Sequence, residues 1–342
     1  MRYSHRFFLY APVAALVVLA AAVALYWSVS VQAFARKLDA MNGAEVAPGV
    51  TLHFKSDSLS GFPFRVDAVL KNLRLDVAGP HGQASWQTEK FALHMLDYSA
   101  ATLVFEAAGQ QQLSWHDAAG KAQALSFLPG LLRASVHSRG GRFERFDIEL
   151  VAARLADFAI ARGGFHLRRD PKSDAFDLVA TATDLHLISS VPSALGDVIP
   201  RVRLDARLAP GGPWEALFAG SGDWRSAAKN WQAHQGGLSV DHLEIAWGKA
   251  DAKGAGLLML DGARRPYGEI KLAVTGYQAL ADEAARRHLV KGPQQSLIAG
   301  VMAEADAAPP RDPGAPLPVT LAFKDGLAYV NSTPAGFLNP LY

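Results

Sequence analysis

The chain has 342 residues, 50% of them apolar, and a formal charge of +2 at pH 7. Because this net charge is nearly neutral and the charged residues are interspersed, the chain lacks the basic footprint of a nucleic-acid-binding protein. The absence of cysteine excludes disulfides, thiolate nucleophiles and cysteine-ligated zinc. A chain of this length can bury a substantial core, so the fold needs neither a disulfide nor a metal to hold it together.

The first forty residues predict a membrane anchor. The uncharged run Leu9–Trp27 would span about 28 Å as a helix, close to the ~30 Å hydrocarbon thickness of a bilayer. Arg2 and Arg6 precede the run, and aromatic rings that favour the headgroup layer lie near its ends. We predict one transmembrane helix over residues 9–29, with residues 1–8 in the cytoplasm.

A cleavable signal peptide is the alternative interpretation of this segment, because Val31–Gln32–Ala33 fits a small-x-small cleavage site. The apolar run exceeds the ~7–15 residues usual for a signal core, which favours an anchor. The Lys/Arg count flanking the run is nearly balanced, but long following domains are translocated largely regardless of charge. Both interpretations place the residues after about 40 in the same compartment. The anchor interpretation predicts a single-pass inner-membrane protein with most of its chain in the periplasm.

From residue 43 onward the chain shows short runs of alternating apolar and polar residues, separated by polar or glycine-rich turns. The clearest is Val202–Ala209, with Val202 and Leu204 on one face and Arg203 and Asp205 on the other. In an earlier run the alternation slips near Lys71–Asn72, which predicts a bulge or bend. Strands of this kind predict an antiparallel sheet with one wetted face over residues 43–209.

The second part, residues 210–342, is predicted to combine strands with helices. Trp224, Ala227, Ala228 and Trp231 have the spacing of a helix face that packs on a core. Two further helices are expected over Gln278–Leu289 and Pro293–Ala305, then a Pro-rich loop over 307–318 and a hairpin at Asp325–Gly326. The predicted fold class is mainly β (α+β): an N-terminal transmembrane helix, a large curved antiparallel sheet and a few covering helices in the C-terminal half.

Two sets of residues carry a resemblance to a known family. The segment Ser60–Asp67 resembles the Gly-Phe/Tyr-Pro-Phe-Arg signature of an uncharacterised proteobacterial envelope family, domain of unknown function 2125. The positions that carry the resemblance are Gly61, Phe62, Pro63, Phe64 and Arg65, followed by Trp247, Gly248, Gly256, Asp261, Pro266, Gly268 and Gly276. The final segment departs from the family pattern, with Asn331–Ser332 where a Gly-Pro pair is expected.

The resemblance implies an inner-membrane-anchored periplasmic protein of mostly β structure. The repeated strand pattern is also similar, more distantly, to AsmA-like envelope proteins, whose long curved sheets are thought to handle lipids. That similarity is an analogy at the level of fold, which does not establish function. The family has no assigned activity, so the resemblance supplies no catalytic residue.

The residues of the two motif sets are expected to be mainly structural. Gly61 would allow an unusual backbone angle, Pro63 would stiffen the start of a strand, and both Phe rings would be buried on one side. Arg65 could cap carbonyl groups, pair with Asp67 or meet lipid headgroups. The glycines of the second set are expected in turns and at a close approach between hairpin strands.

The sequence offers no catalytic, metal-binding or cofactor-binding motif. The 11 histidines show no His-Glu-x-x-His or His-x-His spacing, and a meeting of His234 with His242 would be a chance pair. There is no Gly-x-Ser-x-Gly elbow and no phosphate loop. We therefore expect no catalytic residue, no metal and no cofactor.

These observations predict a non-enzymatic envelope protein that binds or transfers lipid or another hydrophobic ligand. The first alternative is a scaffold that binds an envelope protein through a sheet edge or the Pro-rich loop. The second is a hydrolase whose site converges from distant strands. The predicted partners are therefore the membrane, lipid and envelope proteins, and not nucleic acid.

Overall fold

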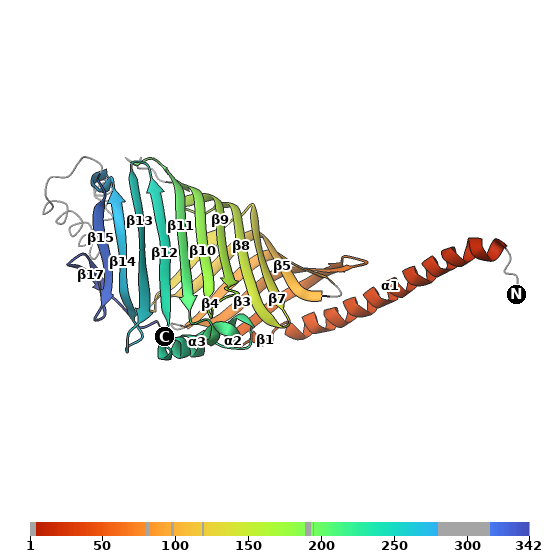
Figure 1. Cartoon of the computed structure of the whole chain (residues 1–342). Helices are drawn as coiled ribbons and strands as arrows, with labels where there is room; N and C mark the ends of the chain where they lie inside the picture. The colour runs from red at the N-terminus through yellow and green to blue at the C-terminus, as the bar shows by residue number, and fades with distance from the viewer. Residues whose placement is uncertain are drawn as a thin grey trace.

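The computed structural model describes residues 5–79, 82–96, 99–117, 120–188, 193, 195–279 and 315–341. Within them, one long helix, α1 (His5–Met41), leads into one large curved sheet (Figure 1). The 37 residues of α1 correspond to about 55 Å of helix. The helix therefore extends far beyond the sheet, with its N-terminal end away from it.

Seventeen strands form the sheet in the described residues. Successive strands pair antiparallel, except that β5 pairs with both β6 and β7. This meander confirms the predicted mainly β fold. The strands are β1 (Glu45–Ala47), β2 (Val50–Ser60), β3 (Arg65–Gly79), β4 (Gly82–Leu96), β5 (Ser99–His116), β6 (Ala122–Phe127), β7 (Leu131–Arg139), β8 (Arg142–Arg154), β9 (Phe158–Arg169), β10 (Phe176–Leu187), β11 (Val198–Ala209), β12 (Gly237–Trp247), β13 (Ala250–Leu260), β14 (Pro266–Thr275), β15 (Leu317–Lys324), β16 (Leu327–Val330) and β17 (Thr333–Phe337).

The strand register gives the sheet one apolar face. Because cross-strand partners point to the same face, a row of partners shows what that face is made of. One row is apolar over twelve successive pairing strands: Ala68, Leu93, Phe105, Ala134, Ile148, Phe165, Ala180, Leu204, Leu243, Gly254, Leu272 and Val319. The row one residue away is largely polar and includes Asp67, His94, Ser135, Asp147 and His166.

The predicted irregularity at Lys71–Asn72 is confirmed. Between β2 and β3 the partners change from His53 with Arg74 to Lys55 with Lys71, so β3 carries one extra residue. Asn72 has a φ of 51°, a left-handed conformation that Asn tolerates better than most residues. The bulge keeps Leu70 and Leu73 on the same buried face although they are three residues apart.

Three short helical segments cover one end of the sheet's apolar face: η1 (Gly212–Trp214), α2 (Glu215–Phe218) and α3 (Trp224–Ala233). Asp223 caps α3 by accepting a 2.9 Å hydrogen bond from the backbone N–H of Ser226. Ala227, Ala228 and Trp231 of the predicted core-facing stripe are buried, whereas Trp224 at its start is only partly buried. The indole of Trp231 donates to the carbonyl oxygen of Ala209, at the end of β11.

An aromatic cluster holds these helices on the strands. Phe176 is fully buried, and its ring centroid lies 5.9 Å from that of Phe143 and 4.8 Å from that of Phe218 in α2. Trp214 stacks on Phe218 and meets Trp231 edge to face. The cluster therefore joins β8 and β10 to all three helical segments.

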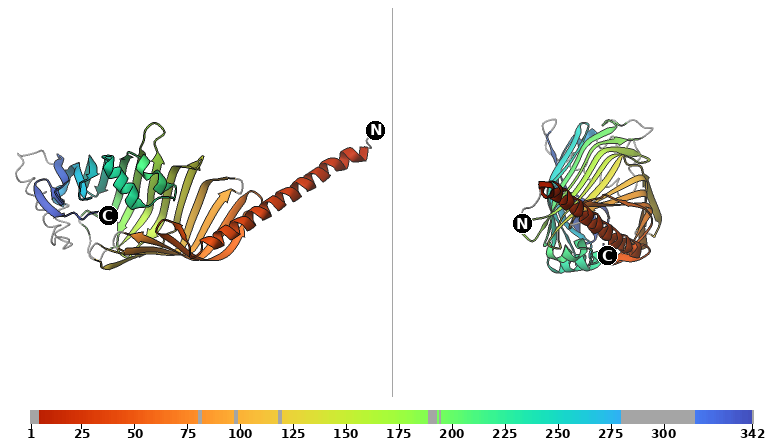
Figure 2. Two further views of the ribbon diagram at one scale, coloured as in Figure 1. Left: turned by 90° about the horizontal axis from the view of Figure 1, so that it is seen from below. Right: turned by 90° about the vertical axis from the view of Figure 1, so that its right-hand side faces the viewer.

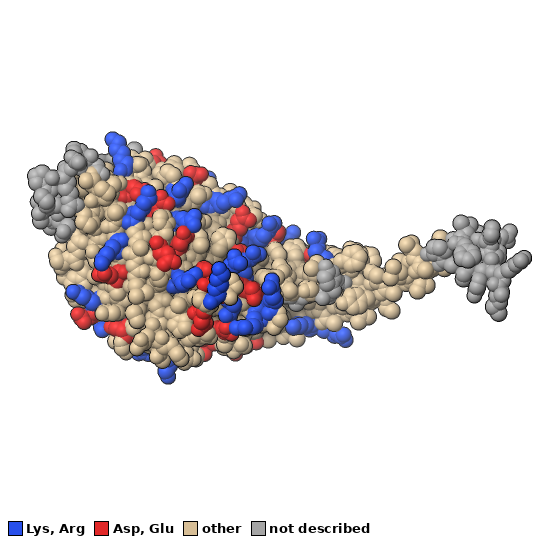
Figure 3. Space-filling model, viewed as in Figure 1, with Lys and Arg blue, Asp and Glu red and all other residues tan. Residues whose placement is uncertain are grey.

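The sheet is strongly curved, and α1 leaves it at one end. Figure 2 shows the strands wrapping round a trough, with α2 and α3 at its rim and α1 projecting away. On the face shown in Figure 3, positive and negative side chains are interspersed over the strands and sparse along α1. This distribution agrees with a wetted outer face of the sheet and an apolar helix.

Several predictions fall partly or wholly outside the described residues. Residues 280–314 hold nearly all of the two helices predicted over 278–289 and 293–305, and most of the Pro-rich loop. The predicted hairpin is present, since β15 and β16 pair across Asp325 and Gly326, which have φ values of 53° and 76°. The division into residues 43–209 and 210–342 stays a prediction, although β11 and β12 pair across it in one sheet.

Candidate functional site: an apolar groove at the end of the helix

A groove of about 590 Å³ lies where α1 meets the apolar face of the sheet, a volume typical of small-molecule sites. All of the residues that line it are apolar. They come from α1 and from strands β2 to β8: Leu38, Met41, Leu52, Leu70, Leu73, Leu75, Trp86, Phe91, Leu93, Phe105, Ala107, Leu113, Phe127, Leu132, Ala134 and Ile148.

The C-terminal part of α1 closes one side of the groove. Phe34, Leu38 and Met41 recur at helical spacing, and Leu38 is 5% exposed within a cluster that includes Phe54 and Leu70. Because Leu38 and Met41 also line the groove, the segment that ends the apolar helix is itself part of the site.

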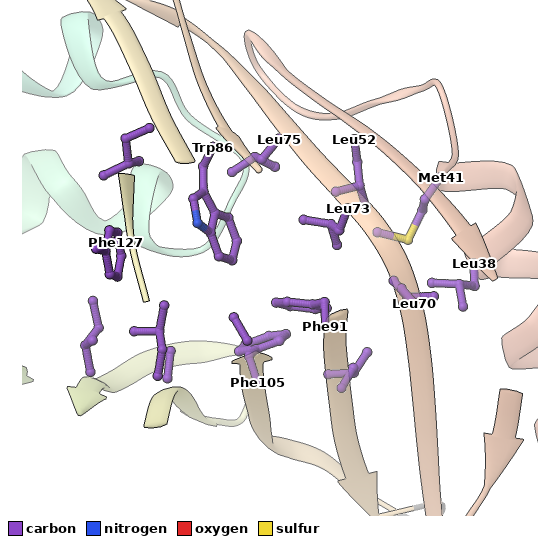
Figure 4. A pocket seen from close by; sticks show the side chains of 16 residues that line it. Leu38, Met41, Leu52, Leu70, Leu73, Leu75, Trp86, Phe91, Phe105 and Phe127 are labelled. Atoms are coloured by element: carbon purple, nitrogen blue, oxygen red, sulfur yellow. The ribbon is translucent and has the colours of Figure 1, made fainter. Parts of the chain in front are cut away.

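Aromatic rings form much of the groove wall (Figure 4). Phe91 stacks on Phe105 with a centroid distance of 5.8 Å, and Trp86 meets Phe91 edge to face at 6.1 Å. Rings in these offset and edge-on arrangements hold one another in place. The wall is therefore fixed by side-chain packing as well as by the strands.

The polar groups behind the wall are satisfied within the protein. Gln111 is fully buried, and its side-chain oxygen accepts a 3.0 Å hydrogen bond from the indole of Trp86. Its amide donates to the Thr88 hydroxyl at 2.9 Å and to the Gly109 carbonyl oxygen at 3.1 Å. The indole N–H of Trp86 is the one hydrogen-bond donor among the lining side chains, and this network already satisfies it. The groove therefore presents a hydrocarbon surface.

The first motif forms the turn between β2 and β3 rather than part of a strand. Gly61 has a φ of 105°, and a Cβ there would lie 2.6 Å from the carbonyl oxygen of Arg65, so glycine is required. The Arg65 N–H donates back to Gly61 at 3.0 Å. β2 ends at Ser60 and β3 begins at Arg65, so Pro63 lies in the turn and not at a strand entry.

The prediction that both Phe rings are buried is wrong. Phe62 is 56% exposed and Phe64 is 61% exposed. The apparent alternation of Phe62, Phe64 and Val66 suggested a strand, but the turn at Gly61 turns both rings outward. Phe62 instead meets Trp27 of α1 edge to face, with a centroid distance of 5.4 Å.

Arg65 takes one of the roles considered for it, that of pairing with Asp67. Its guanidinium lies 2.8 Å from the Asp67 carboxylate, whose other oxygen lies 2.6 Å from His94 Nδ1. The Arg65 carbonyl oxygen accepts a 2.9 Å hydrogen bond from the Trp27 indole. The turn is thus tied both to the sheet and to α1.

The second motif set lies in β12 to β14, eight or more strands along the meander from β3, so the structure does not bring the two sets together. A Cβ at Gly256 would lie 2.1 Å from the Glu269 carbonyl oxygen, and one at Gly268 would lie 2.1 Å from that of Leu257. Gly248 and Gly276, with φ values of 58° and 63°, have similar restrictions. These close approaches agree with a structural role.

Trp247, Asp261 and Pro266 complete this set. The Trp247 indole donates to the Gly196 carbonyl oxygen at 2.8 Å, and Pro266 begins β14 opposite Leu260. Asp261 accepts hydrogen bonds from the backbone and guanidinium of Arg265 at 2.9 and 2.8 Å. Burial raises the pKa of this carboxyl, but these bonds outweigh burial and hold the pKa below its usual value.

At residue 331, where the sequence departs from the family pattern, asparagine adopts a backbone conformation that glycine usually occupies. Asn331 has a φ of 53°, so it occupies a conformation for which glycine is the usual choice. Its side-chain oxygen accepts a 2.7 Å hydrogen bond from the backbone N–H of Thr320. Asn331 therefore fulfils the conformational role of the expected glycine.

Two polar clusters outside the groove, one around Asp147 and one with His234 and His242, do not have the arrangement of a catalytic triad or a metal site. Asp147 contacts both Ser135 and His166, but the serine donates to the carboxylate and not to the imidazole. His234 bonds Asn230 and His242 lies near Glu244, so these two histidines have separate partners. Within the described residues, no group of three or more metal-ligating side chains is present.

The groove residues were not identified from the sequence as a site. Their signal was the alternation along β3 to β8, which predicted an apolar face but not where that face is hollowed. The hollow depends on sheet curvature and on the docking of Leu38 and Met41, neither of which follows from the alternation.

The comparisons with known proteins identify a family and no function. No curated protein matches the chain. The model of a family described as "uncharacterized protein conserved in bacteria (DUF2125)" matches residues 27–338. Because the match covers most of the chain, including α1 from Trp27 and nearly the whole sheet, this protein belongs to the DUF2125 family.

Proposed function

We propose that this protein is anchored in the inner membrane by α1 and binds lipid or another hydrophobic ligand in the apolar groove. The observation that carries the proposal is the all-apolar lining, to which the anchor helix itself contributes Leu38 and Met41. A site built this way receives its ligand close to the bilayer. The apolar row that continues across the sheet from Ala68 to Val319 supports the same function.

The groove is large enough for useful affinity. Each methylene buried in it contributes ~0.8 kcal/mol, so ten contribute about 8 kcal/mol. That free energy corresponds to a dissociation constant of about 1 μM before the cost of association is subtracted. Because association itself costs several kcal/mol, micromolar binding needs an acyl chain with more than ten buried methylenes or further contacts along the apolar face.

The anchor and the periplasmic location are part of the proposal. In the described residues, one helix is long and apolar enough to cross a membrane, and a signal sequence would pass the same test. Trp27 precedes the Val31–Ala33 cleavage site, and it contacts Phe62 and Arg65 of the first motif. Cleavage would remove these contacts, which favours a retained helix.

We propose a binding role and not a catalytic one. The groove lining carries no nucleophile, acid or base, so a hydrophobic ligand would be held there without being altered. The alternative of a scaffold, and the resemblance to AsmA-like proteins, stay predictions.

The test compares lipids that copurify with the full chain and with two variants. Ala134→Trp places a large ring in the groove, whereas Ala124→Trp makes the same change at an exposed position of β6. The protein is extracted in detergent and washed, and its bound lipid is measured by mass spectrometry. Lipid around α1 is the same in all three proteins, so their difference reports the groove.

We expect the wild type and Ala124→Trp to retain the same lipid and Ala134→Trp to lose most of it. Circular dichroism establishes that Ala134→Trp keeps its strand content. Equal lipid in all three folded proteins would contradict the proposal.

A further inference from the structure

The turn between β2 and β3 exposes two aromatic rings beside Trp27 of α1, where polar residues begin to interrupt the apolar helix. Phe62 and Phe64 are each more than half exposed, as is Tyr26 of α1. Trp27, which is followed by the polar residues Ser28, Ser30 and Gln32, contacts this turn through both its ring and its indole N–H. The aromatic residues therefore gather at one level along the helix axis.

That level coincides with the expected surface of the bilayer. The run Leu9–Trp27 matches the hydrocarbon thickness, and most of the side chains described within it are exposed, Leu16 and Leu19 by more than 60%. After Trp27 the helix packs on the sheet through Phe34 and Leu38. Trp27 thus lies at the boundary between the lipid-exposed and the protein-packed parts of α1.

We propose that Phe62 and Phe64 insert into the interfacial layer of the same membrane that α1 crosses, so that the turn is a second membrane contact. Aromatic rings favour the headgroup level, where their apolar body leaves water. The backbone bond from Arg65 to Gly61 holds the turn tight and points both rings outward. Two contacts, one helix and one turn, fix the tilt of the sheet and hence the height of the groove above the lipid.

This inference rests on the proposed membrane anchor but not on ligand binding in the groove. The chain has no cysteine, so single-cysteine variants can be spin-labelled without removing any native thiol. Phe64→Cys reports the turn and Leu19→Cys reports the anchor. Phe337→Cys is the matched control, since Phe337 is 89% exposed on β17 at the far end of the sheet.

The full chain is reconstituted in phospholipid bilayers, and electron paramagnetic resonance measures collisions of each label with oxygen and with a water-soluble nickel chelate. Oxygen concentrates in the bilayer and the chelate in water. We expect the oxygen-to-chelate collision ratio at residue 64 to exceed that at residue 337 several-fold and to approach that at residue 19.

Three other outcomes of this experiment would contradict membrane insertion of the turn. An aqueous ratio at residue 64 with a lipid-like ratio at residue 19 would overturn the inference and leave the anchor intact. Aqueous ratios at both positions would overturn the anchor as well. A label at residue 64 that is shielded from both reagents would place a second copy of the chain on the turn, which also contradicts membrane insertion.

Discussion

The indole Nε1 of Trp27 donates a 2.9 Å hydrogen bond to the carbonyl oxygen of Arg65, thirty-eight residues further along the chain. This bond and the Trp27–Phe62 ring contact join the apolar helix to the first hairpin of the sheet. Because the same helix supplies Leu38 and Met41 to the groove, its docking determines where the groove lies relative to the anchor.

Trp27→Phe tests this docking by removing the donor while keeping an aromatic ring against Phe62. Loss of one hydrogen bond costs about 1 kcal/mol, which corresponds to roughly fivefold faster local opening. Hydrogen exchange of a peptide covering residues 61–65 measures the change. Tyr26→Phe, a change at a neighbouring exposed ring, should leave exchange unaltered. Unchanged exchange in Trp27→Phe would show that the indole bond does not hold the turn.

Gly256→Ala tests the close approach of β13 and β14. The added Cβ would lie 2.1 Å from the Glu269 carbonyl oxygen, so the strands must move apart. Overpacking of this kind costs about 1–3 kcal/mol of unfolding free energy. Gly262→Ala is the control, because no heavy atom lies within 4 Å of the Cβ added there. Thermal unfolding should separate the two variants, and equal midpoints would contradict the structural role of Gly256.

Phe176→Ala tests the aromatic cluster beneath α2 and α3. Phe176 is fully buried against Phe143 and Phe218, so its truncation should cost about 3–5 kcal/mol of unfolding free energy. Phe337→Ala removes the same ring from an 89% exposed position and should change stability by less than about 0.5 kcal/mol. Denaturant unfolding followed by circular dichroism measures both, and similar losses would contradict the assigned core.

The ion pair between Asp261 and Arg265 makes the free energy of unfolding depend on pH in the acidic range. Its pKa is below the usual value in the folded chain, so the unfolded chain takes up the proton first as pH falls. The carboxylate therefore stabilises the fold above pH ~4, the ordinary carboxyl pKa, and this contribution is lost at lower pH.

Asp261→Asn should reduce stability at pH 7 and weaken its fall between pH 7 and pH 3, as measured by unfolding at both pH values. Gly262→Ala, a neighbouring change that removes no titratable group and meets no heavy atom within 4 Å, should keep the wild-type pH dependence. An Asp261→Asn protein with the same pH dependence as the wild type would contradict the assigned role of the Arg265 pair.

Much of the fold follows from local patterns in the sequence. Alternation located the strands, and the change of phase at Lys71–Asn72 located the bulge, because each strand residue faces either the core or water. The helical spacing of Ala227, Ala228 and Trp231 identified the face of α3 that is buried. In these cases the structural feature depends on residues that are neighbours in the chain, so a local sequence pattern predicts it.

The environment of Phe62 and Phe64 could not be read in this way. Their alternation with Val66 is the same in a strand and in a turn that precedes one, and the two are distinguished only by the backbone conformation at Gly61 and the contact of Phe62 with Trp27. The groove likewise depends on residues as distant as Leu38 and Ile148. Their convergence is a property of sheet curvature and helix docking, which no single segment encodes.

Occupancy of the groove by lipid in the cell can be measured directly by photocrosslinking. A photoreactive phenylalanine analogue at Phe91, in the groove wall, and at Phe337, exposed on β17, would be activated in intact cells and each purified protein weighed by mass spectrometry. We predict lipid adducts at position 91 and none at position 337. Absence of lipid adducts at position 91, or equal amounts at both positions, would contradict a lipid-binding groove.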